Sequence, residues 1–161
     1  MLIVMSDLHF ADSGSYNLNG RRYNHNLPSE VYSSFFNEIS DFIGDCDVDS
    51  IDLVLAGDIF EITRSALWHD GQLRPYLHND EIVEGSQAEA MVLRVMDAIT
   101  EDERVDATLG IFRRLSDFYQ KPVKIHFVPG NHDRLANSSQ AVRNRVQSIL
   151  GLETTGSFFE N

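Results

Sequence analysis

The sequence predicts an α/β fold in which a mostly parallel sheet is flanked by helices. Three short runs of aliphatic and β-branched residues, at 2–5, 51–56 and 123–128, have the length and composition of strands. Between and after these runs, apolar residues recur at the spacing of amphipathic helices. Because alternating strands and helices form parallel sheets with right-handed crossovers, this order predicts one α/β domain over residues 1–161.

The composition is that of a folded domain. Of the 161 residues, 42% are hydrophobic and 24% are charged, which excludes a chain that is mainly disordered. The sequence has no run of about 18 apolar residues, so we expect no membrane-spanning helix. Cys46 is the single cysteine, which excludes an intrachain disulfide. Because the first residues also lack a signal-peptide pattern, we expect a cytoplasmic protein.

The charge balance is strongly acidic. Lysine and arginine total 13 against 25 aspartates and glutamates, a formal net charge of −12. Such a field repels polyanions, so we do not expect nonspecific binding to nucleic acid. An acidic protein can still handle phosphate groups through divalent cations, because a bound cation is then the largest local charge.

The three strands differ in their patterns. Leu2–Met5 is apolar throughout and Ile51–Ala56 is nearly so, as in strands that are covered on both faces of a parallel sheet. Val123–Val128 is interrupted by His126, which we interpret as a structural histidine.

The first two helices are predicted from a cap and an apolar stripe each. The first helix follows Pro28 with Ser29 as its cap, and its stripe comprises Val31, Phe35, Phe36, Ile39, Phe42 and Ile43. A capping box at Ser86 and Glu89 opens the second helix, whose apolar side carries Ala88, Met91, Val92, Val95, Met96 and Ile99.

Two further helices follow. A second capping box, at Thr100 and Glu103, opens a helix that carries Val105, Leu109, Phe112, Leu115 and Phe118. The last helix begins at Asn137 or Ser138 and ends at Gly151. Two long loops, 10–28 and 59–85, interrupt the alternation, and loops of this length in a compact domain are usually functional or disordered.

Polar residues that can bind metal ions follow each predicted strand. Asp7 and His9 follow the first, Asp58 follows the second, and Asn131 and His132 follow the third. Because the carboxyl ends of parallel strands meet at one edge of a sheet, these side chains should converge. Carboxylate and amide oxygens and imidazole nitrogens are ligands of divalent cations, and one carboxylate between two strand ends can bridge two of them.

These residues resemble a known family. Asp7-Leu8-His9, Gly57-Asp58 and Gly130-Asn131-His132-Asp133 are similar, in order, to the first three signature blocks of the calcineurin-like metallophosphoesterases. The resemblance covers about residues 1–135. It implies the first half of that family's αββα sandwich, and a hydrolase that cleaves a phosphomonoester or phosphodiester with a dinuclear metal site and a metal-bound hydroxide.

The resemblance also implies a role for each matched residue. Two cations, Mn²⁺, Fe²⁺ or Zn²⁺, would be held by Asp7 and His9 on the first metal, Asp58 as the bridge and Asn131 on the second. His132 would be the general acid, and Asp133 would orient its imidazole and keep it cationic.

Two residues near Asp58 are candidates on their own chemistry. Arg64 follows Asp58 by six residues and is a candidate donor to a substrate phosphate, with an exposed surface arginine as the alternative. Glu61 either supports the site from behind the ligands or faces solvent.

The sequence departs from the family downstream. Family members carry further histidine ligands after the third block, whereas no histidine follows His132 here. The alternative to an active phosphoesterase is therefore a truncated or degenerate metallophosphoesterase domain, incomplete at its C-terminus and holding one metal ion or none. Such a domain would need a missing segment or a partner, and a homo-oligomer would cover the sheet face left exposed.

Overall fold

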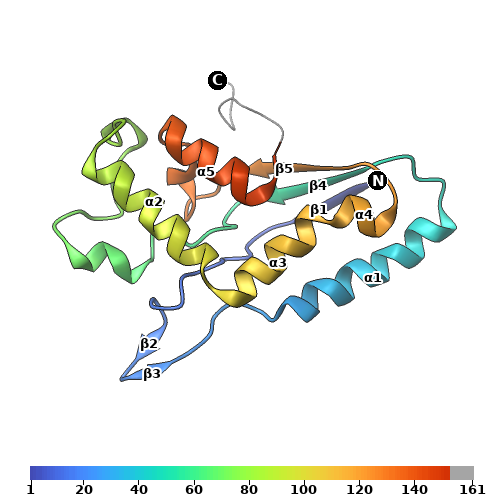
Figure 1. Ribbon diagram of the computed structural model, residues 1–161, viewed down its shortest axis with the longest axis horizontal. Coiled ribbons are helices and arrows are strands. Elements are labelled where there is room, and N and C mark those ends of the chain that lie inside the picture. Colours follow the sequence, from blue (N-terminus) through green and yellow to red (C-terminus); the bar gives the residue numbers. More distant parts are fainter. Residues whose placement is uncertain (153–161) are drawn as a thin grey trace.

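The computed structural model describes residues 1–152 and has an α/β fold built on a three-stranded parallel sheet (Figure 1). The strand order is β1 (Leu2–Met5), β4 (Ile51–Ala56) and β5 (Val123–Val128), with β4 in the centre. These bounds are those of the three predicted strands. Residues 153–161, which the predicted domain includes, lie outside the described part of the chain.

Helices lie in both crossovers and after the last strand. The α-helices of residues 1–152 are α1 (Ser29–Asp45), α2 (Gln87–Thr100), α3 (Glu103–Arg113), α4 (Leu115–Tyr119) and α5 (Gln140–Leu150). Shorter elements are the 3₁₀ helices Ala66–Asp70, Asn79–Glu81 and Arg134–Asn137, and a hairpin of β2 (Asn17–Leu18) with β3 (Arg21–Arg22). Within the described residues, no helix is long and apolar enough to cross a membrane.

The core lies on one face of the sheet. Ile51, Leu53 and Leu55 alternate into that face, are at most 1% exposed, and join one hydrophobic cluster with residues of all five α-helices. On the opposite face, Leu2 is 65% and Val4 is 58% exposed. The interpretation of these strands as covered on both faces is therefore wrong for the described chain: its helices pack against one face only, and the other contacts solvent.

The helix α1 buries only part of the predicted stripe, Phe36 and Ile43, together with Tyr32, which the prediction did not include. Tyr32, Phe36 and Ile43 enter the core and are at most 8% exposed. The predicted members that remain in contact with solvent are Val31 (48% exposed), Phe35 (38%) and Phe42 (66%). This segment contains two apolar stripes one residue apart, one through Val31 and Phe35 and the other through Tyr32 and Phe36. The stripe through Tyr32 and Phe36 is the one that α1 buries in the core.

Helix starts agree with the prediction at one position and are shifted at three others. The first shift is in α1, where the expected cap, Ser29, is the first helical residue and Pro28 takes the cap position without a side-chain hydrogen bond. The Ser86 hydroxyl caps α2 as expected, by accepting a hydrogen bond from the Glu89 amide (3.1 Å). Asp102 caps α3, whereas the expected cap, Thr100, is the last residue of α2. Ser139 caps α5, one residue beyond the expected start. The helix expected to run through Phe118 breaks at residue 114, between α3 and α4.

Hydrogen bonds hold the first long loop, residues 10–28, in place at several positions. The Asn26 side chain accepts from the Ala11 amide and donates to the Ala11 carbonyl, both at 2.9 Å. The Asn26 carbonyl accepts from Nη1 of Arg104 on α3 (2.8 Å). The Ser15 hydroxyl accepts from the Ala66 amide (2.8 Å), which links this loop to the one after β4. The two loops therefore lie against each other beyond the carboxyl ends of the strands.

Candidate metal centre

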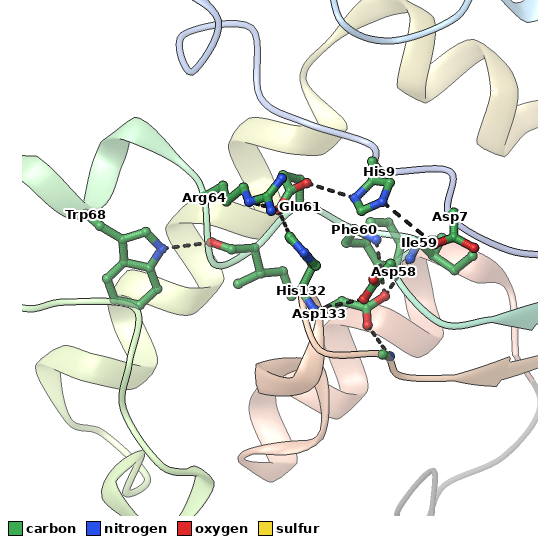
Figure 2. A network of polar contacts seen from close by, with 12 residues as sticks. Asp7, His9, Asp58, Ile59, Phe60, Glu61, Arg64, Trp68, His132 and Asp133 are labelled. Atoms are coloured by element: carbon green, nitrogen blue, oxygen red, sulfur yellow. Dashed lines mark hydrogen bonds and ion pairs between the residues drawn. The ribbon is translucent and has the colours of Figure 1, made fainter.

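The ends of β1 and β4 remain paired beyond the sheet, which brings the first two polar clusters together. The Asp7 amide donates to the carbonyl of the residue before Asp58 (3.1 Å), and the His9 amide donates to the Asp58 carbonyl (2.9 Å). A parallel bridge continues the pairing one step further. As a result, Asp7, His9 and Asp58 each present a ligand atom within 4.8 Å of the others (Figure 2).

The end of β5 joins the same edge through two glycines. The Gly57 amide donates to the Val128 carbonyl (2.7 Å), and the His132 amide donates to Oδ1 of Asp58 (2.8 Å). A Cβ atom on Gly130 would lie 2.5 Å from the Asp58 amide nitrogen and 2.9 Å from the Gly57 Cα. Position 130 therefore requires glycine, because the turns after β4 and β5 are in direct backbone contact.

Candidate ligands have unusual backbone conformations. The φ angle is 55° at Asp7, 48° at His9 and 52° at Asp58, all in the left-handed region. Non-glycine residues rarely adopt such angles, which cost of the order of 1–3 kcal/mol each and cluster at functional sites. The cross-strand amide bonds hold these three residues in place, so the strain marks the edge of the sheet as a specialised site.

Glu61 joins the two histidines of the site. Its side chain is 1% exposed, and its Oε2 lies 2.8 Å from His9 Nδ1 while its Oε1 lies 2.5 Å from His132 Nδ1. An ionised carboxylate can only accept hydrogen bonds, so both imidazoles donate through Nδ1. The Nε2 atoms are therefore the nitrogens left for a cation or a substrate, and Nε2 of His9 is 3.9 Å from Oδ1 of Asp7.

Asp133 does not take its expected role. It is fully buried, and its carboxylate accepts hydrogen bonds from the amides of Ile59 (2.7 Å), Phe60 (3.2 Å) and Gly130 (2.5 Å). Glu61, and not Asp133, holds the His132 imidazole. Burial raises the pKa of the Asp133 carboxyl; the three amide bonds partly oppose this rise, and the neighbouring Asp58 adds to it. Asp133 therefore fastens the turn after β5 to the turn after β4.

Arg64 and Asn131 lie at the solvent-facing rim. The Arg64 side chain is 65% exposed and its Nε is 3.9 Å from Oε1 of Glu61 (Figure 2). Asn131 directly precedes His132 at the same edge, and its side chain is exposed. All the residues that the sequence nominated thus reach one edge of the sheet.

The donor set fits a divalent cation. Two groups of ligand-capable side chains share His9: one with Asp7 and Asp58, the other with Glu61 and His132. Because Glu61 already engages Nδ1 of both histidines, the group with Asp7 and Asp58 is the better cation site. Its carboxylate oxygens and one imidazole nitrogen suit Mn²⁺, Fe²⁺ or Zn²⁺.

Comparison of the chain with protein-family models, with curated proteins and with solved structures finds no match. The function proposed below therefore depends on the α/β fold, on the geometry of this edge and on the resemblance of the three strand-end segments.

Proposed function

We propose that the chain is a metal-dependent phosphoesterase, which hydrolyses a phosphomonoester or phosphodiester with two divalent cations at the edge formed by the three strand ends. The observation that carries this proposal is the arrangement of His9 and His132 on the single buried carboxylate of Glu61, beside Asp7 and Asp58. The similarity of the three strand-end segments to metallophosphoesterase signature blocks supports it.

The cations have ligands in this arrangement. Asp7, His9 and Asp58 would hold one cation, and Asp58 with Asn131 would hold the other. When bound, such cations polarise the phosphoryl group and lower the pKa of water. Arg64, at the rim, offers a fork of donors to the phosphoryl oxygens.

His132 is placed to protonate the leaving group. Its Nδ1 donates to Glu61, so in the imidazolium form the second proton is on Nε2, from which it can be transferred. As the bond between phosphorus and the leaving oxygen breaks, the leaving alkoxide takes that proton and the imidazole becomes neutral. Glu61 keeps the ring in one orientation throughout and thus acts as a positioning residue for both histidines.

The test is turnover of p-nitrophenyl phosphate and bis(p-nitrophenyl) phosphate by the purified chain during a Mn²⁺ titration, for wild type and Asp58→Asn. The substitution removes the shared charge but retains an acceptor for the His132 amide. We expect Mn²⁺ affinity to fall by about 100-fold or more and turnover to fall to background, with an unchanged circular dichroism spectrum.

Asp52→Asn is the matched control, because it makes the same chemical change on β4, the strand that Asp58 follows, at a residue that is 48% exposed in its side chain. We expect it to leave Mn²⁺ affinity and turnover within about twofold of wild type. Mn²⁺ binding without turnover of either ester would refute the catalytic proposal. Unchanged Mn²⁺ binding by Asp58→Asn would refute the metal site itself.

A second candidate function is favoured by the open face of the sheet. Leu2, Val4 and Val128 are 65%, 58% and 39% exposed there. On this reading the chain is a metal-binding domain that hydrolyses esters only when another segment or subunit covers the face. Sedimentation velocity distinguishes the two: a size that rises with concentration supports the second function, and a monomer with full turnover excludes it.

A further inference from the structure

A groove of about 510 Å³ lies between α1 and the segment where α3 ends and α4 begins. Its volume is within the range of small-molecule sites, about 300–1,000 Å³. Because α4 directly precedes β5 in the chain, this groove lies toward the amino ends of the strands, away from the candidate metal centre (Figure 1). A ligand bound in it would therefore be separate from the chemistry proposed above.

The floor of the groove is apolar and its walls are joined. Phe36 and Leu115 line it and are 1% exposed, and Ile111 packs against the same hydrophobic cluster. The Tyr119 hydroxyl on α4 donates to the Phe36 carbonyl on α1 (2.9 Å), which holds the two walls together. Phe118 also lines the groove, yet it is 49% exposed. An apolar group in the groove would therefore remove an aromatic ring from water at a preformed surface.

Two opposite charges lie at the rim of the groove. Arg114 and Asp117 both line it, are both exposed, and lie three positions apart at the start of α4. The Arg114 Nε donates to the Gly110 carbonyl (3.0 Å), which leaves the terminal guanidinium nitrogens for another acceptor. Among the side chains that the structure describes, Arg114 and Asp117 form no ion pair with each other or with a third residue. The rim therefore presents a guanidinium fork beside an unpaired carboxylate.

This pair of charges limits the ligands that fit. A ligand with only an anionic group would be repelled by Asp117 and by the net charge of −12, and a ligand with only a cationic group would be repelled by Arg114. A ligand with both a carboxylate and an ammonium group would have an opposite charge for each of the two. The rest of such a ligand gains most if it is apolar, because it then covers Phe118 and the floor.

We propose that this groove binds a free α-amino acid with a large apolar side chain. The Arg114 guanidinium binds the carboxylate, the Asp117 carboxylate binds the ammonium group, and the apolar side chain lies against Phe118 and the floor. The site does not depend on the proposed phosphoesterase function, because none of its lining residues lies at the carboxyl ends of the strands.

The test is an NMR titration of the full chain with four compounds near neutral pH. L-phenylalanine carries both charges and a ring, 3-phenylpropionate lacks the ammonium group, phenethylamine lacks the carboxylate, and L-alanine lacks the ring. We expect L-phenylalanine to bind about fivefold more tightly than either singly charged analogue, and about tenfold more tightly than L-alanine. The shifts that it causes should centre on residues that line the groove.

Two variants separate the charges. Asp117→Asn should weaken L-phenylalanine binding by about fivefold without weakening the binding of 3-phenylpropionate. Arg114→Gln should weaken L-phenylalanine binding by a similar factor without weakening the binding of phenethylamine. A general loss of structure would instead weaken the binding of every compound.

The control is Asp41→Asn, which makes the same change as Asp117→Asn at an exposed position of α1 outside the groove. It should leave the affinity for L-phenylalanine within about twofold of wild type. Equal affinities for L-phenylalanine and its two singly charged analogues, no detectable binding of L-phenylalanine, or an affinity that is insensitive to Asp117→Asn would each overturn the proposal. Turnover of p-nitrophenyl phosphate tests the phosphoesterase separately, so the two proposals can fail independently.

Discussion

Gly130→Ala is the sharpest perturbation of the contact between the turns after β4 and β5. The added methyl carbon would lie 2.3 Å from Oδ1 and 2.5 Å from the amide nitrogen of Asp58. Nonbonded heavy atoms prefer about 3.5 Å, so relief of the nitrogen contact requires the turns to separate by about 3.5 − 2.5 = 1 Å. Overpacking of this kind costs about 1–3 kcal/mol, equivalent to a melting temperature lower by about 2–12 °C.

The same displacement should reach the metal centre, because Asp58 is the residue that the methyl group strikes. A misplacement of about 1 Å costs of the order of 100-fold in rate, so turnover should fall more than stability alone explains. The assay combines thermal unfolding, Mn²⁺ titration and turnover of p-nitrophenyl phosphate at a temperature where the variant is folded.

Gly110→Ala in α3 is the matched control for this variant. Its Cβ would meet Nη2 of Arg114 at 3.7 Å, an ordinary contact. Replacement of a helix-interior glycine by alanine should stabilise the fold by up to about 1 kcal/mol and leave Mn²⁺ binding unchanged. If Gly130→Ala melts and binds Mn²⁺ like wild type, the reasoning about the two turns is refuted.

Three further predictions concern single side chains. Glu61→Gln leaves an acceptor oxygen for only one of the two imidazoles, so steady-state turnover should drop about 10–100-fold, and unchanged turnover would contradict the positioning role. Burial raises the pKa of Tyr119 from 10.0 to about 12, so its stabilising contribution is complete below pH 10 and is lost as the pH rises toward 12. In urea unfolding, the free energy of unfolding of Tyr119→Phe should therefore decline less between pH 10 and 12 than that of wild type. At pH 7 the variant should be about 1 kcal/mol less stable, because the hydrogen bond to the Phe36 carbonyl is lost. An equally steep decline would show that another group titrates. Asp102→Ala removes the cap of α3 and should cost about 0.5–2 kcal/mol in urea unfolding, whereas an unchanged midpoint would mean that the cap contributes nothing.

The sheet could be predicted from the sequence because its strands are the chain's three short aliphatic runs. The buried face of α1 could not be predicted, because apolar residues are adjacent at positions such as Phe35 and Phe36. Periodicity alone then fits two faces of the helix that differ by one residue, about 100°. Which of these faces is buried depends on the contacts of α1 with the rest of the core and with α3, and the sequence of α1 alone does not determine those contacts.

The convergence of the candidate site was predictable, and its internal contacts were not. Each strand end is visible locally, and parallel pairing brings the ends together. The resemblance implies that His132 pairs with its neighbour in sequence, Asp133, but the structure places Glu61, 71 residues away, in that position. The Asp133 carboxylate instead accepts hydrogen bonds from three backbone amides, and the sequence alone does not show that these amides lie nearby. The only indication of Glu61 in the sequence is that it is an acidic residue three positions after Asp58.

The pairing that continues past β1 and β4 affects the lifetime of the candidate site. Amides in a loop beyond a sheet usually exchange with solvent through small local openings. The amides of Asp7, His9 and Gly57 are bonded to carbonyls of the neighbouring segments, in continuity with the central ladder. We expect these amides to exchange only when that ladder separates, so that the turns with the candidate ligands persist as long as the core does. A cation bound at the proposed site would therefore meet a preassembled backbone and would have no loop to order.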